Sequence, residues 1–158
     1  MTTMVVVASK HGSTAEIGEH IAATLKARGV SAHVKEVSEA GKWLFETDNV
    51  VLGVPVYRQK LWGPGMMFLD ANRTELGGKP LFLFASGGGP SLAPELAETL
   101  RSYPHREVAY FRGAIDAEKL SFFEKLQLKV VKAPENADYR DWPGIEDWSQ
   151  SLIAYGLS

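Results

Sequence analysis

The stretch MVVVASKHGST, residues 4–14, joins an apolar run, Met4–Ala8, to a short polar loop, Ser9–Thr14. A helical pattern begins near Thr14, so the loop lies between a predicted buried strand and a predicted helix. At such a junction the first N–H groups of the helix have no intrahelical partner, and the positive end of the helix dipole lies behind them. The loop therefore predicts an anion site, most often for a phosphate, to which Lys10 adds a positive charge.

Ordinary helix capping is the alternative for this loop. The run Ser13-Thr14-Ala15-Glu16 matches a capping box, in which Ser13 accepts from the backbone three residues on and Glu16 reaches back. Capping does not explain the residues that precede Ser13, so anion binding is favoured. His11 is either a neighbour of the ligand or a solvent-facing residue.

Size and composition predict one domain covering residues 1–158. The 158 residues are 45% apolar, which suffices for a core, and the net charge of −2 provides no basic field for nucleic acid. The absence of cysteine excludes disulfides and thiolate metal sites, and the four histidines are dispersed, so no metal site is expected. The N-terminus lacks a signal-peptide layout and no apolar run is long enough to span a membrane, so a cytoplasmic location is expected.

Short apolar runs predict strands that are covered on both faces. One further strand, Val30–Lys35, is second in the sequence. It alternates apolar and polar residues and is therefore placed at a sheet edge. The four apolar runs are Met4–Ala8, Asn49–Val54, Leu81–Ala85 and Val108–Phe111.

Helical patterns separate these strands. In the first helix Ile17, Ile21 and Leu25 share one face, Gly18 allows close approach to the sheet, and Gly29 ends the helix. Pro143 suits the first turn of the last helix. The remaining helical patterns are a weak one near Ala40–Phe45 and clear ones at Gly63–Arg73, Leu92–Leu100 and Ile145–Ala154.

Repeated strand–helix alternation predicts an α/β fold, a doubly wound five-stranded parallel sheet of order 2-1-3-4-5 with helices on both faces. Ligands bind such sheets beyond the carboxyl ends of the strands, where the winding reverses. The loops at that edge are Ser9–Thr14, Pro55–Trp62 and Ser86–Ser91.

The second and third loops carry features that fit a flat ligand. Tyr57 and Trp62 are candidates to stack on an aromatic ring, or else cover a helix end. Arg58 or Lys60 neutralises an anionic ring, or is simply solvated. The three glycines Gly87–Gly89 indicate close backbone approach to a planar ligand, or else a tight turn into a helix with Ser91 as its N-cap.

Several common families with a related layout lack their motifs here. No G-x-G-x-x-G follows the first strand, and no G-x-x-x-x-G-K-[ST] is present, so nicotinamide binding and nucleoside triphosphate hydrolysis are not expected. Signalling receiver domains need an Asp where Pro55 stands, and small tyrosine phosphatases need a cysteine.

The chain resembles flavodoxin-type FMN domains, and more narrowly the flavodoxin-domain family that includes menaquinone-dependent protoporphyrinogen IX dehydrogenase. The resemblance covers most of the chain and lies in residues 8–17, Val50–Gly53 with Tyr57, Phe111–Ile115, Lys132–Glu135 and Asp138–Trp142.

The resemblance implies FMN as cofactor, with its phosphate in the first loop and its ring between the other two. The phosphate would be held by Ser9, His11, Gly12, Ser13 and Thr14, and the ring would lie between Pro55, Val56 and Tyr57 on one side and Ser86, Gly87 and Gly88 on the other. The charged, aromatic and glycine residues of the three loops add four further residues to the candidate site: Lys10, Arg58, Trp62 and Gly89.

The function expected from this resemblance is that of an FMN-dependent oxidoreductase, which passes electrons between a reduced organic substrate such as a porphyrinogen and a quinone-like acceptor. A flavodoxin electron carrier is one alternative, and a flavin-free domain that binds another phosphate or a protein partner is a second. No catalytic side chain is identified.

Residues 117–132 mix apolar side chains with four lysines. One interpretation is a basic amphipathic helix resting on the inner membrane, where quinone resides. The favoured interpretation is a helix that packs its apolar face on the domain and solvates its lysines. Oligomeric state is left open.

Overall fold

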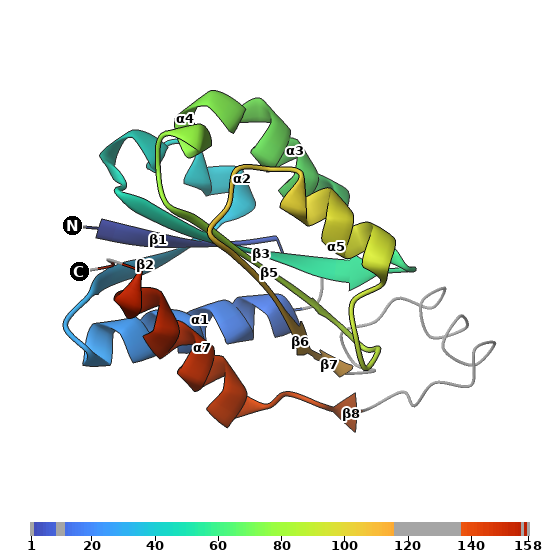
Figure 1. Ribbon diagram of the computed structural model, residues 1–158. Coiled ribbons are helices and arrows are strands. Elements are labelled where there is room, and N and C mark those ends of the chain that lie inside the picture. The colour runs from blue at the N-terminus through green and yellow to red at the C-terminus, as the bar shows by residue number, and fades with distance from the viewer. Residues whose placement is uncertain (1, 9–11, 116–136, 156, 158) are drawn as a thin grey trace.

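The computed structural model describes residues 2–8, 12–115, 137–155 and 157 (Figure 1). The predictions for Ser9, Lys10 and His11, and for a helix over residues 117–132, lie outside the described residues. The described elements are β1 (Thr2–Val7), α1 (Ser13–Ala27), β2 (Ser31–Glu36), α2 (Val37–Ala40), the 3-10 turn η1 (Leu44–Glu46), β3 (Asn49–Tyr57), β4 (Lys60–Leu61), α3 (Gly63–Ala71), α4 (Arg73–Gly77), β5 (Leu81–Gly87), α5 (Pro94–Arg101), β6 (Glu107–Arg112), β7 (Ala114–Ile115), β8 (Ala137–Asp138) and α7 (Trp142–Ala154).

The predicted parallel sheet is confirmed. Its strands run in the order β2-β1-β3-β5-β6, which is the expected order 2-1-3-4-5 once the two-residue strand β4 is counted separately. All four neighbouring pairs in this order are parallel, whereas β4 pairs antiparallel with the end of β3. The order reverses between β1 and β3, which places the expected ligand edge beyond the ends of these strands.

Helices cover both faces of the sheet, as Figure 1 shows: α1 and α7 lie on one face, and α2, α3, α4 and α5 lie on the other. The alternation along β1 explains how one strand serves both layers. Met4 and Val6 belong to the core under α3, α4 and α5, whereas Val5 and Val7 belong to the core under α1 and α7.

The two edge strands differ from the buried centre. As predicted, β2 alternates, with Ser31 and His33 exposed and Ala32 buried. The expectation that the strand at Val108–Phe111 is covered on both faces is wrong, because every residue of β6 is half-buried. Its position in the sheet explains this: among the described strands, β6 has a neighbour on one side only.

The first helix meets the sheet as its glycines predicted. A Cβ on Gly18 would lie 2.5 Å from Cγ1 of Val7, so only glycine permits this distance between α1 and β1. Gly29 follows the helix with a φ of 86°, the left-handed conformation that ends many helices.

Other helix boundaries differ from the predicted ones. The pattern predicted over Gly63–Arg73 divides at Asn72 into α3 and α4, and the weak pattern near Ala40–Phe45 divides into α2 and η1. The alternative interpretation of the third loop, with Ser91 as a helix N-cap, is wrong, because α5 begins at Pro94 with Ala93 as its N-cap residue. Proline at the first helical position explains the shift, since it has no N–H to leave unpaired.

Two features of the C-terminal part complete the fold. Pro143 lies in the first turn of α7, as predicted, and the Asp141 side chain caps that helix by accepting from the Gly144 N–H. The antiparallel pair β7–β8, which the sequence analysis missed, brings Ala114 opposite Asp138. None of the described helices is both long enough and apolar enough to cross a membrane.

Candidate ligand site at the carboxyl edge of the sheet

The three predicted loops start from strands whose ends lie side by side. Val7 at the end of β1 is paired with Gly53 in β3, and Pro55 in β3 is paired with Ser86 in β5. The Ala8 N–H continues the first pairing by donating to the Gly53 carbonyl at 3.0 Å. The carboxyl edge therefore brings together the parts of these loops that the structure describes.

The first loop ends in a helix start with free donors. Gly12 is the N-cap residue of α1, with a φ of 88°, and no side-chain cap is found there among the described residues. The first intrahelical bond runs from the Glu16 N–H to the Gly12 carbonyl, and the N–H groups of Ser13, Thr14 and Ala15 have no acceptor among the described residues. Three N–H groups at the positive end of a 15-residue helix suit an anion.

The capping-box alternative is wrong for this helix. The hydroxyl of Ser13 accepts a hydrogen bond from the Ala114 N–H at 2.9 Å instead of capping α1. Close packing supports this contact, because a Cβ on Gly113 would lie 2.9 Å from the Ser13 Oγ. Ser13 thus fixes the start of α1 against the chain that leaves β6.

A buried hydrogen bond joins the first and third loops. The Thr14 Oγ1 and the Ser86 Oγ lie 2.7 Å apart, and the two residues are 2% and 3% exposed. Either hydroxyl can be the donor. Because a buried hydroxyl without a partner is costly, each side chain holds the other in place.

The second loop is a hairpin rather than the irregular loop expected after Val54. Strand β3 continues to Tyr57, and β4 returns after a turn made by Arg58 and Gln59. The hairpin closes with the Trp62 N–H donating to the Pro55 carbonyl at 3.0 Å. It therefore holds Trp62 close to Pro55, and both were predicted to contact the ligand.

The hairpin turn is strained. Arg58 and Gln59 have φ values of 52° and 60°, in the left-handed region that favours glycine and asparagine. The Arg58 guanidinium lies 5.3 Å from the centre of the Tyr57 ring. Pro55, Val56 and Tyr57 are half-buried, so this end of β3 remains accessible.

The third loop begins with close packing at Gly87. A Cβ there would lie 3.2 Å from both the Tyr110 Oη and the Val56 Cβ, so the residue's small size allows the strand ends to approach. Gly88 and Gly89 are exposed, and neither N–H donates a hydrogen bond to any part of the chain that the structure describes.

Two side chains of β6 hold the glycines of the third loop, Gly87–Gly89, which we call the glycine loop. The Tyr110 hydroxyl donates to the Gly89 carbonyl at 2.7 Å, and Nη2 of Arg112 donates to the Gly88 carbonyl at 2.8 Å. Burial raises the pKa of Tyr110, so its hydroxyl stays protonated and can donate.

The guanidinium of Arg112 is itself anchored. It lies 3.7 Å from the centre of the Tyr139 ring, which is cation–π geometry, and the Tyr139 N–H donates to the Gly113 carbonyl at 3.2 Å. Sequence patterns did not predict the contributions of Tyr110, Arg112 and Tyr139 to this loop. Only the two-residue spacing of Tyr110 and Arg112, which puts both on one face of a strand, could have signalled them.

An ion-pair cluster connects the chain after β8 to the start of α1. Arg140 donates to both carboxylate oxygens of Asp138, at 2.9 and 2.7 Å, and also to the carboxylate of Glu16. The guanidinium lies 4.7 Å from the centre of the Trp142 ring. Hydrogen bonds from Arg140 lower the pKa of Asp138 to about 2, so this carboxylate is charged at neutral pH.

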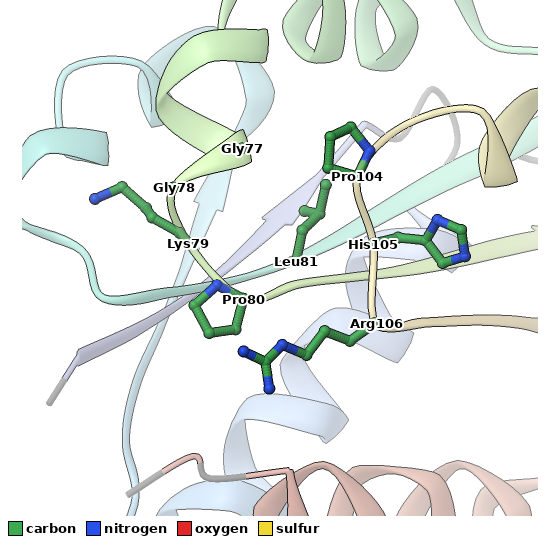
Figure 2. A pocket seen from close by; sticks show the side chains of 8 residues that line it. All are labelled: Gly77, Gly78, Lys79, Pro80, Leu81, Pro104, His105 and Arg106. Atoms are coloured by element: carbon green, nitrogen blue, oxygen red, sulfur yellow. The ribbon is translucent and has the colours of Figure 1, made fainter.

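A shallow pocket of about 270 Å³ lies elsewhere on the molecule (Figure 2). It is lined by Gly77–Leu81 and Pro104–Arg106, at the amino ends of β5 and β6 and therefore opposite to the three loops. Its basic side chains, Lys79, His105 and Arg106, point in different directions in Figure 2. They do not converge on one ligand position, so the pocket is not the candidate site.

The described residues contain no group of three His, Asp or Glu side chains placed to hold a metal ion. The donors at the carboxyl edge are backbone N–H groups and hydroxyls, which suit an anionic organic ligand better than a cation.

Solved structures share this fold. Oxidised flavodoxin 1 from Bacillus cereus is 19% identical, with a TM-score of 0.65 and 100% of both chains covered. A flavodoxin from the domain Archaea is 21% identical, with a TM-score of 0.59, 84% of this chain and 97% of that chain. A variant of the flavo-diiron protein from Thermotoga maritima is 16% identical, with a TM-score of 0.66, over 99% of this chain but only 36% of that one.

At these identities the structural matches show the fold alone. No curated protein matches the sequence significantly. The sequence does match the flavodoxin domain family over residues 4–141, which includes the start of α1, the β3–β4 hairpin and the glycine loop. The chain therefore belongs to the flavodoxin domain family.

Proposed function

We propose that this protein binds FMN at the carboxyl edge of its sheet and acts in electron transfer. The observation that carries the proposal is the convergence of two sets of available N–H groups on this edge. One set, Ser13–Ala15, opens α1, and the other, Gly88 and Gly89, follows β5. Membership of the flavodoxin domain family supports the same conclusion.

The start of α1 suits the phosphate of FMN. The N–H groups of Ser13, Thr14 and Ala15 supply donors, and the helix dipole favours negative charge there. Thr14 is held by Ser86 and Ser13 by Ala114, so the donors are ordered before a ligand arrives. Ser9, Lys10, His11 and Gly12 stay predicted contributors to the same anion site.

The other two loops suit the flavin ring. Apolar and aromatic contacts are offered by Pro55, Val56 and Tyr57 at the end of β3 and by Trp62 after the hairpin. The Arg58 guanidinium lies beside the Tyr57 ring. Gly88 and Gly89 offer backbone donors, and Gly87–Gly89 together offer a surface that lacks side chains. We place the ring between these two loops.

Bound FMN would supply the capacity to accept and release electrons. The protein's part is to bind, to orient and to tune. Backbone N–H groups of the glycine loop stabilise negative charge at the part of the ligand they face, because an amide donates more strongly to an anionic acceptor than to a neutral one. Reduction adds negative charge, so these donors favour the reduced form.

Two roles are consistent with such a site. An electron carrier is favoured by the match over the full length of flavodoxin 1 from Bacillus cereus. An FMN-dependent oxidoreductase is favoured by the modest net charge of −2, since a carrier that docks by long-range attraction needs a stronger field. A porphyrinogen substrate, a quinone acceptor and contact with a membrane remain narrower proposals that rest on the sequence resemblance.

Fluorescence titration of the purified apoprotein tests the proposal. FMN fluorescence is expected to change saturably with one site per chain, and riboflavin, which lacks the phosphate, is expected to bind more weakly. Equal affinity for FMN and riboflavin would remove α1 as the phosphate site, and the absence of FMN binding by folded protein would remove the function. Anaerobic turnover with quinones and porphyrinogens then separates the enzyme from the carrier.

A further inference from the structure

Two neighbouring side chains on β6 hold two successive carbonyl groups of the glycine loop. Arg112 donates to the Gly88 carbonyl at 2.8 Å and Tyr110 donates to the Gly89 carbonyl at 2.7 Å. The two bonds look equivalent, but their consequences differ because of the residue that follows each carbonyl. The Gly88 carbonyl is followed by Gly89, which has a backbone N–H. The Gly89 carbonyl is followed by Pro90, which has no backbone N–H.

A trans peptide bond fixes the direction of the Gly89 N–H. In a trans peptide the C=O of one residue and the N–H of the next point in opposite directions, and none of the described peptide bonds is cis. Because the Gly88 carbonyl points to Arg112, the Gly89 N–H points away from it. This N–H is among the donors without a partner in the described residues.

The Arg112 side chain is held in place by its own contacts. Its guanidinium lies against the Tyr139 ring at 3.7 Å, its Nε is buried, and Tyr139 is tied to the Gly113 carbonyl by its N–H. A guanidinium stays charged at all working pH values, so the bond to Gly88 is charge-assisted. The direction of the peptide between Gly88 and Gly89 is therefore set by an anchored guanidinium.

We propose that Arg112 is a positioning residue for the flavin: it holds the Gly88 carbonyl toward β6 and thereby points the Gly89 N–H at the bound ring. The inference rests on the proposed FMN function. An N–H so directed bonds the reduced ring more strongly than the oxidised ring, because reduction adds negative charge. Arg112 therefore raises the midpoint potential as well as the affinity.

Three variants of the full chain separate position from charge. Arg112→Ala removes the bond and the charge. Tyr139→Leu removes the ring that holds the guanidinium but changes no charge at neutral pH. Tyr110→Phe, the matched control, removes the neighbouring bond to the Gly89 carbonyl, which is followed by no N–H. The folded state of each apoprotein is first checked by circular dichroism and thermal melting.

The FMN dissociation constant and the two-electron midpoint potential are then measured. We expect Arg112→Ala to raise the dissociation constant about tenfold, the effect of one charge-assisted hydrogen bond. We also expect Arg112→Ala to weaken the binding of reduced FMN about tenfold more than the binding of oxidised FMN. This difference lowers the midpoint potential by about 30 mV. Tyr139→Leu is expected to shift both quantities in the same direction by less, and Tyr110→Phe is expected to shift the midpoint by less than Arg112→Ala does.

Two results overturn the inference while leaving FMN binding intact. If Tyr139→Leu keeps the wild-type midpoint, Arg112 acts through its charge alone. If Tyr110→Phe lowers the midpoint as far as Arg112→Ala, general loosening of the loop controls the potential. If the folded wild-type protein fails to bind FMN, the proposed function itself is wrong and this inference falls with it.

Discussion

The hydroxyl oxygens of Thr14 and Ser86 lie 2.7 Å apart in the buried interior, although 72 positions separate the two residues in the sequence. This bond fastens the start of α1 to the end of β5, and so fixes the distance between the proposed phosphate site and the glycine loop. Neither hydroxyl can be replaced alone without leaving the other buried and unsatisfied.

A double-mutant cycle measures this bond. Thr14→Val and Ser86→Ala are each expected to lower the free energy of unfolding by about 1–3 kcal/mol, the cost of an unsatisfied buried hydroxyl. The double variant is expected to lose less than the sum, with a coupling energy of about 1 kcal/mol. Urea denaturation of the apoprotein provides the measurement, and strictly additive losses would show that the two hydroxyls do not interact.

The strained turn of the β3–β4 hairpin predicts a gain in stability. Gln59 has a φ of 60°, where a side chain costs about 1–2 kcal/mol that glycine avoids. After the larger entropy of glycine in the unfolded chain is subtracted, Gln59→Gly is expected to exceed the matched variant Gln59→Ala in unfolding free energy by about 0.5–1 kcal/mol. Equal stabilities of the two variants would argue against the left-handed turn.

The contact of α1 with the sheet predicts a loss at Gly18. A Cβ there would lie 2.5 Å from the Val7 Cγ1, so Gly18→Ala must shift the helix. We expect a loss of about 1–3 kcal/mol, the usual cost of overpacking, despite the better helix propensity of alanine. Gly77→Ala is the control, because nothing lies within 4 Å of its added methyl group. Thermal melts that rank Gly18→Ala at or above wild type would refute the close contact.

The Asp138–Arg140 pair predicts a pH dependence of stability. The folded pKa of Asp138 is about 2, below the value of about 3.9 in unfolded chains. A lowered carboxylate pKa stabilises the folded state fully above about pH 4, and this contribution disappears as the pH falls toward 2. Asp138 is about half exposed, so solvent screening keeps the effect small.

Comparison of Asp138→Asn with wild type by thermal melting between pH 2 and pH 7 checks this. The wild-type protein is expected to melt higher near neutral pH, and the difference is expected to vanish near pH 2. Asp147→Asn, which removes an exposed carboxylate from α7, controls for net charge. A difference that persists unchanged at pH 2 would contradict the assigned ionisation.

The strands and their order were predictable because they depend on local sequence patterns. Apolar runs at Met4–Ala8 and Leu81–Ala85 lie in buried strands, and the right-handed crossover rule then leaves few orders. The hairpin at Arg58 and Gln59 was missed because it lacks the Asn or Gly that marks such turns. The β7–β8 pair was missed because two-residue strands have no periodicity.

The site was predictable to the level of loops but not of contacts. The topology located the carboxyl edge, and glycine and hydroxyl residues marked the loops there. Which partners Ser13 and Thr14 contact depends on tertiary packing: Ser13 bonds Ala114 and Thr14 bonds Ser86. The role of Arg112 likewise depends on the loop that folds over it, and a single charged residue near a strand end carries no such information in the sequence.

Titration of the isotopically labelled apoprotein with FMN, followed through the backbone amide signals by NMR, tests the central claim most directly. The account predicts that the amides of Ser13–Ala15 and of Gly88 and Gly89 shift as FMN saturates one site, while those around the pocket of Lys79 and Arg106 keep their positions. Saturation of FMN binding with the amides of α1 and the glycine loop unchanged would contradict it.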